Sequence, residues 1–89
     1  VSYELIKIFP NPFNPQVNID FFMEQSLIVD LNIYDLKGRL VESLISNEFM
    51  VSGNHSISWR PKNLSSGDYL VKLSNDKSII TTKKVTYLK

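Results

Sequence analysis

Residues 29–41 read Val-Asp-Leu-Asn-Ile-Tyr-Asp-Leu-Lys-Gly-Arg-Leu-Val, and this stretch indicates the fold. The apolar residues Val29, Leu31 and Ile33 alternate with polar ones, which is typical of a strand with one buried face. Residues 35–38 then fit a type I turn closed by a glycine at positive φ, a common hairpin loop. The stretch therefore predicts a β-hairpin in which Asp35 accepts local backbone N–H bonds.

The same period of two residues recurs along the whole chain. It predicts seven strands, at Leu5–Phe9, Val17–Phe22, Leu27–Tyr34, Arg39–Ser46, His55–Arg60, Asp68–Ser74 and Ile79–Leu88. Arg39–Ser46 also suits one short helical face, but its shortness and the turn before it favour a strand. We expect a tight turn at residues 74–77. Seven short strands with turn signals between them predict an all-β fold, an immunoglobulin-like antiparallel β-sandwich.

The composition narrows the class of protein. The chain has 89 residues, of which 43% are hydrophobic and 21% charged, as expected for one globular domain. A net charge of +1 argues against a nucleic-acid partner or a polybasic membrane anchor. The chain begins without Met or a signal peptide, so we expect residues 1–89 to be one domain of a longer protein, with residues 1–4 the end of a linker.

Few side chains in the sequence could catalyse a reaction or bind a metal ion. The absence of cysteine excludes disulfides, thiolate catalysis and cysteine zinc sites. His55 is the only histidine, and it lacks an evident partner, so it is interpreted as a strand-start residue. Calcium binding at Asp35 or at residues 75–76 is a weaker alternative. We therefore expect no catalytic residue, metal or cofactor. The scattered acids are predicted to be solvated: Asp20, Glu24, Asp30, Asp35, Glu42 and Glu48.

The aromatic residues allow two interpretations. Trp59 and the tyrosines could form a platform for sugars, which requires an exposed aromatic row. However, Trp59 has the same parity as Ile57, which places it in the core. We expect Tyr34, Tyr69 and Tyr87 to bury their rings and keep each hydroxyl at a polar rim.

The most distinctive stretch is Phe9-Pro10-Asn11-Pro12-Phe13-Asn14-Pro15. Proline has no N–H to give to a sheet, so Pro10–Pro15, called here the proline segment, is predicted to be a stiff connection between two strands. We expect it to close one end of the sandwich, with the rings of both Phe9 and Phe13 filling that end.

Four stretches resemble, in the right order, the type A C-terminal sorting domains of the type IX secretion system, which occur on exported proteins of the Bacteroidetes and related phyla. They are residues 9–15, 33–41, 64–71 and 83–85. The first three are also similar to the Ig-like domain of flagellar hook-capping proteins. The residues that carry the first two signatures are Pro10, Asn11, Pro12, Phe13, Asn14, Pro15, Asp35, Gly38 and Arg39.

The resemblance implies a sorting signal. Its host would cross the inner membrane, pass the periplasm and reach the cell surface or medium through the outer-membrane machinery, with a sortase cutting before Leu5. The implied recognition candidates are Gly67, Tyr69, Lys83, Lys84 and Val85. These residues also have a structural interpretation. Gly67 permits a loop conformation, Tyr69 fills the core, and Lys83 and Lys84 protect an edge strand from aggregation. The alternative function is a non-catalytic accessory or spacer module of an extracellular enzyme or surface protein, with carbohydrate binding as a further option.

Overall fold

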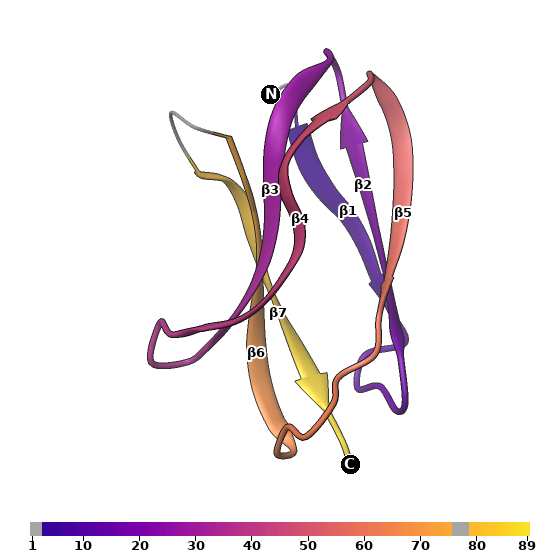
Figure 1. Ribbon diagram of the computed structural model, residues 1–89. Coiled ribbons are helices and arrows are strands. Elements are labelled where there is room, and N and C mark those ends of the chain that lie inside the picture. Colours follow the sequence, from indigo (N-terminus) through magenta and orange to yellow (C-terminus); the bar gives the residue numbers. More distant parts are fainter. Residues whose placement is uncertain (1–2, 76–78) are drawn as a thin grey trace.

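The chain folds into two antiparallel β-sheets that face each other (Figure 1). The computed structural model describes residues 3–75 and 79–89. One sheet has the strand order β1-β2-β5 and the other β4-β3-β6-β7. The described residues contain no helix, so the predicted all-β sandwich of seven strands is confirmed. The strands are β1 (Tyr3–Phe9), β2 (Val17–Met23), β3 (Leu27–Asp35), β4 (Leu40–Met50), β5 (Gly53–Trp59), β6 (Gly67–Ser74) and β7 (Ile79–Tyr87).

The strand bounds follow the predicted ones within two residues, except in β4. This strand continues four residues past the predicted end at Ser46, and its register against β3 shifts three times. Asn47 has φ 53°, and its backbone N–H donates to Asp30 Oδ1 at 2.7 Å. Irregular pairing of this kind lets an edge strand bend and continue. In the sequence, the same irregularity interrupts the alternation of apolar and polar residues, so the strand was predicted to end at Ser46. The predicted turn at residues 74–77 lies largely outside the described residues.

The core lies between the two sheets and follows the period-two pattern. Each fully buried large side chain contributes about 1.5–3 kcal/mol relative to its exposed state. The buried hydrophobic residues are Phe13, Val17, Ile19, Phe21, Met23, Val29, Leu31, Ile33, Ile45, Trp59, Tyr69, Val71, Leu73, Val85 and Tyr87. All but Phe13 come from strands, so alternation accounts for nearly the whole described core.

The topology leaves the last strand at an edge. β7 pairs with β6 on one side and forms the end of its sheet. The connection between β1 and β2 lies at the same end of the sandwich as the C-terminus (Figure 1). The proline segment and the end of β7, more than 70 residues apart in the chain, are thereby brought together.

Candidate functional site

The five recognition candidates lie on two neighbouring strands. Gly67 and Tyr69 are on β6, and Lys83, Lys84 and Val85 are on β7. Tyr69 pairs directly with Val85 across the two strands. The structure therefore brings the third and fourth sequence signatures into one antiparallel pair at the edge of the four-stranded sheet.

Two of these candidates belong to the core. Tyr69 is 7% exposed and Val85 is fully buried. The Tyr69 ring meets Trp59 edge-on at 5.9 Å between centroids, and its hydroxyl donates to the Ser65 carbonyl oxygen at 2.7 Å. Burial raises the pKa of this hydroxyl above its ordinary value, so it remains a protonated donor. The expected arrangement for Tyr69, a buried ring with its hydroxyl bonded at the rim, is confirmed.

Gly67 begins β6 with φ 154° and has open space where a side chain would project. It pairs with Tyr87 at the end of β7. A side chain there would be strained by the backbone rather than by a clash.

The two lysines are the accessible candidates. Both are exposed, and successive residues of a strand point to opposite faces. Lys83 pairs with the core residue Val71, and Lys84 pairs with Leu70. The Lys84 ammonium lies 4.0 Å from Asp68 Oδ2, a long and solvent-exposed ion pair. Both flanks of the β7 edge therefore carry positive charge.

The proline segment closes the end of the sandwich, as predicted, but through one aromatic ring rather than two. Phe13 is 2% exposed, and its ring lies 5.1 Å from the Tyr87 ring and 5.5 Å from the Trp59 ring. Phe9 is 37% exposed, with the Lys7 ammonium 4.7 Å from its ring centroid. The prediction for Phe9 was wrong because Phe9 pairs with Asn18, which alternates with the buried residues of β2 and therefore points away from the core.

The same segment hydrogen-bonds to the free edge of β7, which the sequence did not indicate. The Phe13 N–H donates to the Thr86 carbonyl oxygen at 2.9 Å, and the Leu88 N–H donates to the Phe13 carbonyl oxygen at 3.0 Å. Asn11 Oδ1 accepts the Thr86 N–H at 2.9 Å, and Asn11 Nδ2 donates to the Lys84 carbonyl oxygen at 3.5 Å. Asn14 Nδ2 donates to the Leu88 carbonyl oxygen. Proline has no N–H, but the side-chain amides of Asn11 and Asn14 can donate hydrogen bonds in its place. These two asparagines were the only sign in the sequence that the segment could bond to a strand.

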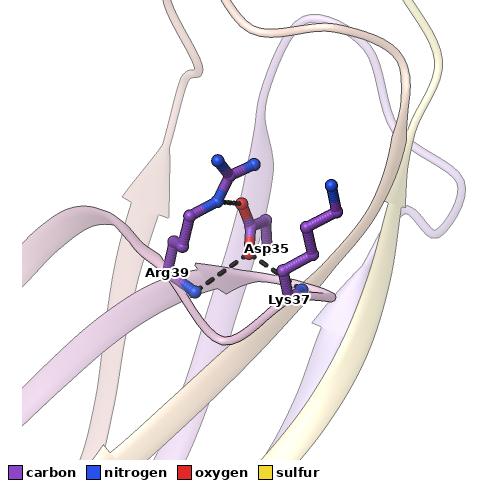
Figure 2. A network of polar contacts seen from close by, with 3 residues as sticks. All are labelled: Asp35, Lys37 and Arg39. Atoms are coloured by element: carbon purple, nitrogen blue, oxygen red, sulfur yellow. Dashed lines mark hydrogen bonds and ion pairs between the residues drawn. The ribbon is translucent and has the colours of Figure 1, made fainter.

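The turn at residues 35–39 is built as predicted (Figure 2). Asp35 Oδ1 accepts the N–H groups of Lys37 and Arg39, each at 2.9 Å, and Oδ2 accepts Arg39 Nε at 2.8 Å. Gly38 has φ 85°, and its N–H donates to the Asp35 carbonyl oxygen. The Arg39 backbone bond is the largest cause that lowers the pKa of Asp35, followed by its side-chain bond and the Lys37 backbone bond. The second signature is therefore a self-contained turn.

Three of the acids predicted to be solvated have other environments. Glu42 Oε1 accepts the Trp59 Nε1–H at 2.9 Å, which links the two sheets. Asp30 accepts the Asn47 N–H, as described above. Asp20 Oδ1 is buried without a hydrogen-bond partner. Glu42 is nevertheless exposed, as predicted, whereas Asp20 and Asp30 are half-buried on the central strands β2 and β3. The prediction was wrong for these two because the sequence alone does not reveal which strands flank them.

One surface depression of about 270 Å³ lies over the three-stranded sheet, lined by Lys7, Asp20, Phe21, Asn54, His55 and Ser56. His55 lies within β5, where its ring stacks on Phe21 at 5.3 Å and Nε2 lies 2.6 Å from the Val51 carbonyl oxygen. Within residues 3–75 and 79–89, no three His, Cys, Asp or Glu residues come together in a group that could hold a metal ion. The described residues also include no helix long and apolar enough to cross a membrane.

The sugar platform is ruled out for Trp59, Tyr34, Tyr69 and Tyr87. Trp59 is 1% exposed, Tyr69 is 7% exposed and Tyr87 is 8% exposed. Tyr34 is half-buried beneath the Lys72 ammonium, which lies 4.5 Å from its ring centroid. These rings therefore form no exposed row.

Comparisons with known proteins agree with the signatures. No curated protein matches the chain significantly. The family described as the secretion system C-terminal sorting domain matches residues 7–87, which covers all but the outermost residues at both ends. That range includes the proline segment, the Asp35 turn and the paired strands β6 and β7. The chain thus belongs to this family, whose members are the C-terminal sorting signals of type IX secretion.

Proposed function

We propose that the sorting signal is recognised at the edge of β7, with Lys83 and Lys84 as the residues that a partner contacts. The observation that carries this proposal is the contrast in exposure within the candidate set. Tyr69 and Val85 are buried, whereas both lysines are exposed at an edge strand. In this proposal Gly67, Tyr69 and Val85 hold the pair β6–β7 in place.

The proline segment supports the same proposal. It provides five hydrogen bonds to the backbone of residues 84–88, and Phe13 packs on Tyr87. These contacts fix the last strand next to the lysines. The first family signature, although distant in sequence, would then contribute to recognition by positioning β7 rather than by touching the machinery.

Export through type IX secretion to the cell surface or the extracellular space follows from the family. The finer route is part of the proposal. Residues 1–89 act as one sorting domain of a longer protein, with residues 1–4 as the end of a linker. The host crosses the inner membrane, passes the periplasm and meets the outer-membrane machinery, where a sortase cuts before Leu5.

We also propose that the chain itself catalyses no reaction. His55 is stacked on Phe21 and its Nε2 lies against a backbone carbonyl, so it is poorly placed to activate a nucleophile. Asp20, which has the buried unpaired oxygen, belongs to a shallow depression on a sheet face. The domain would act as a signal for its host.

Deletion of residues 82–89 tests the sorting role. A reporter with an inner-membrane export signal is fused to the chain and expressed in a bacterium with a type IX system. We expect the full chain to deliver the reporter to the surface or medium and the deletion to leave it in the periplasm. The control is the full chain in a strain that lacks the outer-membrane translocon. Normal export of the deletion would contradict the proposal.

The mass of the exported reporter separates two outcomes. Loss of the domain from the exported protein supports cleavage by a sortase in the linker. Retention of the domain on an exported reporter would contradict the cleavage step while leaving the sorting step intact.

A further inference from the structure

A row of paired residues, called here the Tyr34 row, crosses all four strands of the larger sheet. Leu40 of β4 pairs with Tyr34 of β3, and Tyr34 pairs with Leu70 of β6. Leu70 in turn pairs with Lys84 of β7. Residues directly opposite each other in neighbouring strands have their side chains on the same face of the sheet. The four members of the row come from the stretches that carry the later sequence signatures, residues 33–41, 64–71 and 83–85.

The Tyr34 row lies on the face of this sheet that points away from the three-stranded sheet, called here the outer face. Successive residues of a strand point to opposite faces, and the neighbours of the row along each strand pack in or against the core. These neighbours are Ile33, Val41, Tyr69, Val71 and Val85. Leu40 is 58% exposed, and Tyr34 and Leu70 are half-buried. The row therefore presents an apolar strip to solvent, with a lysine at one end.

The charges that remain free beside this strip are positive. The Lys72 ammonium lies 4.5 Å from the centroid of the Tyr34 ring, and Lys72 forms no ion pair within the described part of the chain. The Lys84 ammonium lies 4.0 Å from Asp68 Oδ2, and 62% of the Lys84 side chain is exposed. An exposed ion pair of this kind contributes little stability. Both lysines can therefore take a carboxylate from outside the domain.

An acidic protein surface fits the outer face better than an anionic membrane or a second copy of the chain. The net charge is only +1, and Asp30 and Asp68 lie on the same face as the lysines, so the face lacks the cluster of cations that holds an anionic membrane. A second copy would bring the same free lysines, and like charges across an interface are costly. A partner with carboxylates around an apolar centre complements both features of the face.

We propose that the outer face, along the Tyr34 row, binds a partner protein whose contact surface is apolar at its centre and acidic at its rim. Leu40, Tyr34 and Leu70 pack against the apolar centre. Lys72 and Lys84 pair with the carboxylates. This inference rests on the proposed function and deepens it, because it extends the recognised surface from Lys84 across the sheet.

Leu40→Glu tests the inference in the reporter fusion. It removes an exposed apolar side chain and places a negative charge opposite the acidic rim, so the ratio of exported to periplasmic reporter should fall about tenfold. Leu40→Lys removes the same apolar side chain but adds the opposite charge, so it should be exported better than Leu40→Glu. The matched control is Phe49→Glu, near the other end of β4, where Phe49 is 64% exposed. This control should be exported normally.

The outcomes separate this inference from the proposed function. Equal export of Leu40→Glu and Phe49→Glu, while deletion of residues 82–89 still traps the reporter, would overturn the inference alone. Normal export of the deletion would instead overturn the proposed function. Equal export of Leu40→Glu and Leu40→Lys would overturn the acidic chemistry of the partner.

Two binding measurements on the purified reporter test the other occupants. They are sedimentation with phosphatidylglycerol vesicles and the mass of the reporter by light scattering. We expect no binding to the vesicles and a monomer. Vesicle binding or dimerisation that Leu40→Glu abolishes would overturn the assignment of the outer face to a partner protein.

Limited proteolysis of each reporter checks that the domain is folded. If Leu40→Glu is unfolded, Lys72→Ala decides, because it removes a rim cation without adding a charge. Its ratio of exported to periplasmic reporter should fall about fivefold. Lys62→Ala, at an exposed lysine outside the strands, is the control and should be exported normally. Equal export of these two variants would overturn the inference.

Discussion

Replacement of Phe13 by alanine tests the role of the proline segment in stability. Phe13 is 2% exposed and contacts the rings of Tyr87 and Trp59. Truncation of a buried phenylalanine costs about 3–5 kcal/mol, through lost transfer free energy and the cavity that remains. An 89-residue domain has a total stability of about 4–13 kcal/mol. Phe13→Ala should therefore remove a large part of it.

Thermal unfolding followed by circular dichroism measures this effect. For a domain of this size, each kcal/mol shifts the melting temperature by about 4–8 °C, so a loss of about 3–5 kcal/mol in Phe13→Ala should lower it by about 12–40 °C. The matched control is Phe9→Ala, in the same stretch. Phe9 is 37% exposed, and its contact with Lys7 is of a kind worth about 0.5–1 kcal/mol. Equal losses for the two variants would refute the assignment of Phe13 as the single ring that closes the sandwich.

Three further changes test individual contacts. Asn11→Ala removes the acceptor of the Thr86 N–H, so the free energy of unfolding should fall by about 1 kcal/mol and the Thr86 amide should exchange its hydrogen faster. Unchanged exchange of this amide would contradict the hydrogen bond. Glu42→Ala removes the acceptor of the Trp59 Nε1–H, so it should lower the free energy of unfolding by about 1 kcal/mol and alter Trp59 fluorescence. Glu42→Gln keeps an acceptor, so the stability and the fluorescence should change less. The backbone and side-chain hydrogen bonds from Arg39 hold the pKa of Asp35 below its ordinary value, so the stabilising effect of this carboxylate is present above that ordinary pKa and is lost as the pH falls through the folded-state pKa. Asp35→Asn should therefore reduce the loss of stability in this acidic range, as measured by urea unfolding at several pH values, and an unchanged acid profile would contradict the shift.

The strands and the Asp35 turn could be predicted from sequence because their causes are local. Alternation in Val29, Leu31 and Ile33 reports burial of one face directly. In the turn, Asp35 and Gly38 lie within four residues of all their partners. Such interactions depend on spacing along the chain, and spacing is visible in the sequence.

The contacts of the proline segment could not be predicted, because they join residues 73–75 positions apart. They exist only once β7 lies at the sheet edge beside the connection between β1 and β2. The same reason explains Glu42, which reaches Trp59 in the opposite sheet. The family signatures at residues 9–15 and 83–85 include the proline segment and part of β7, but the contacts between them follow only from the arrangement of the strands.

The most direct test of the account is the export ratio of the reporter when both β7 lysines are removed. Lys83→Ala with Lys84→Ala is compared with Lys37→Ala and Lys62→Ala, two exposed lysines outside the strands, so that both proteins lose the same charge. The account predicts that the β7 double variant stays folded and its ratio of exported to periplasmic reporter falls about fivefold, while the control is exported normally. Normal export of the β7 variant, or an equal fall in the control, would contradict recognition at this edge.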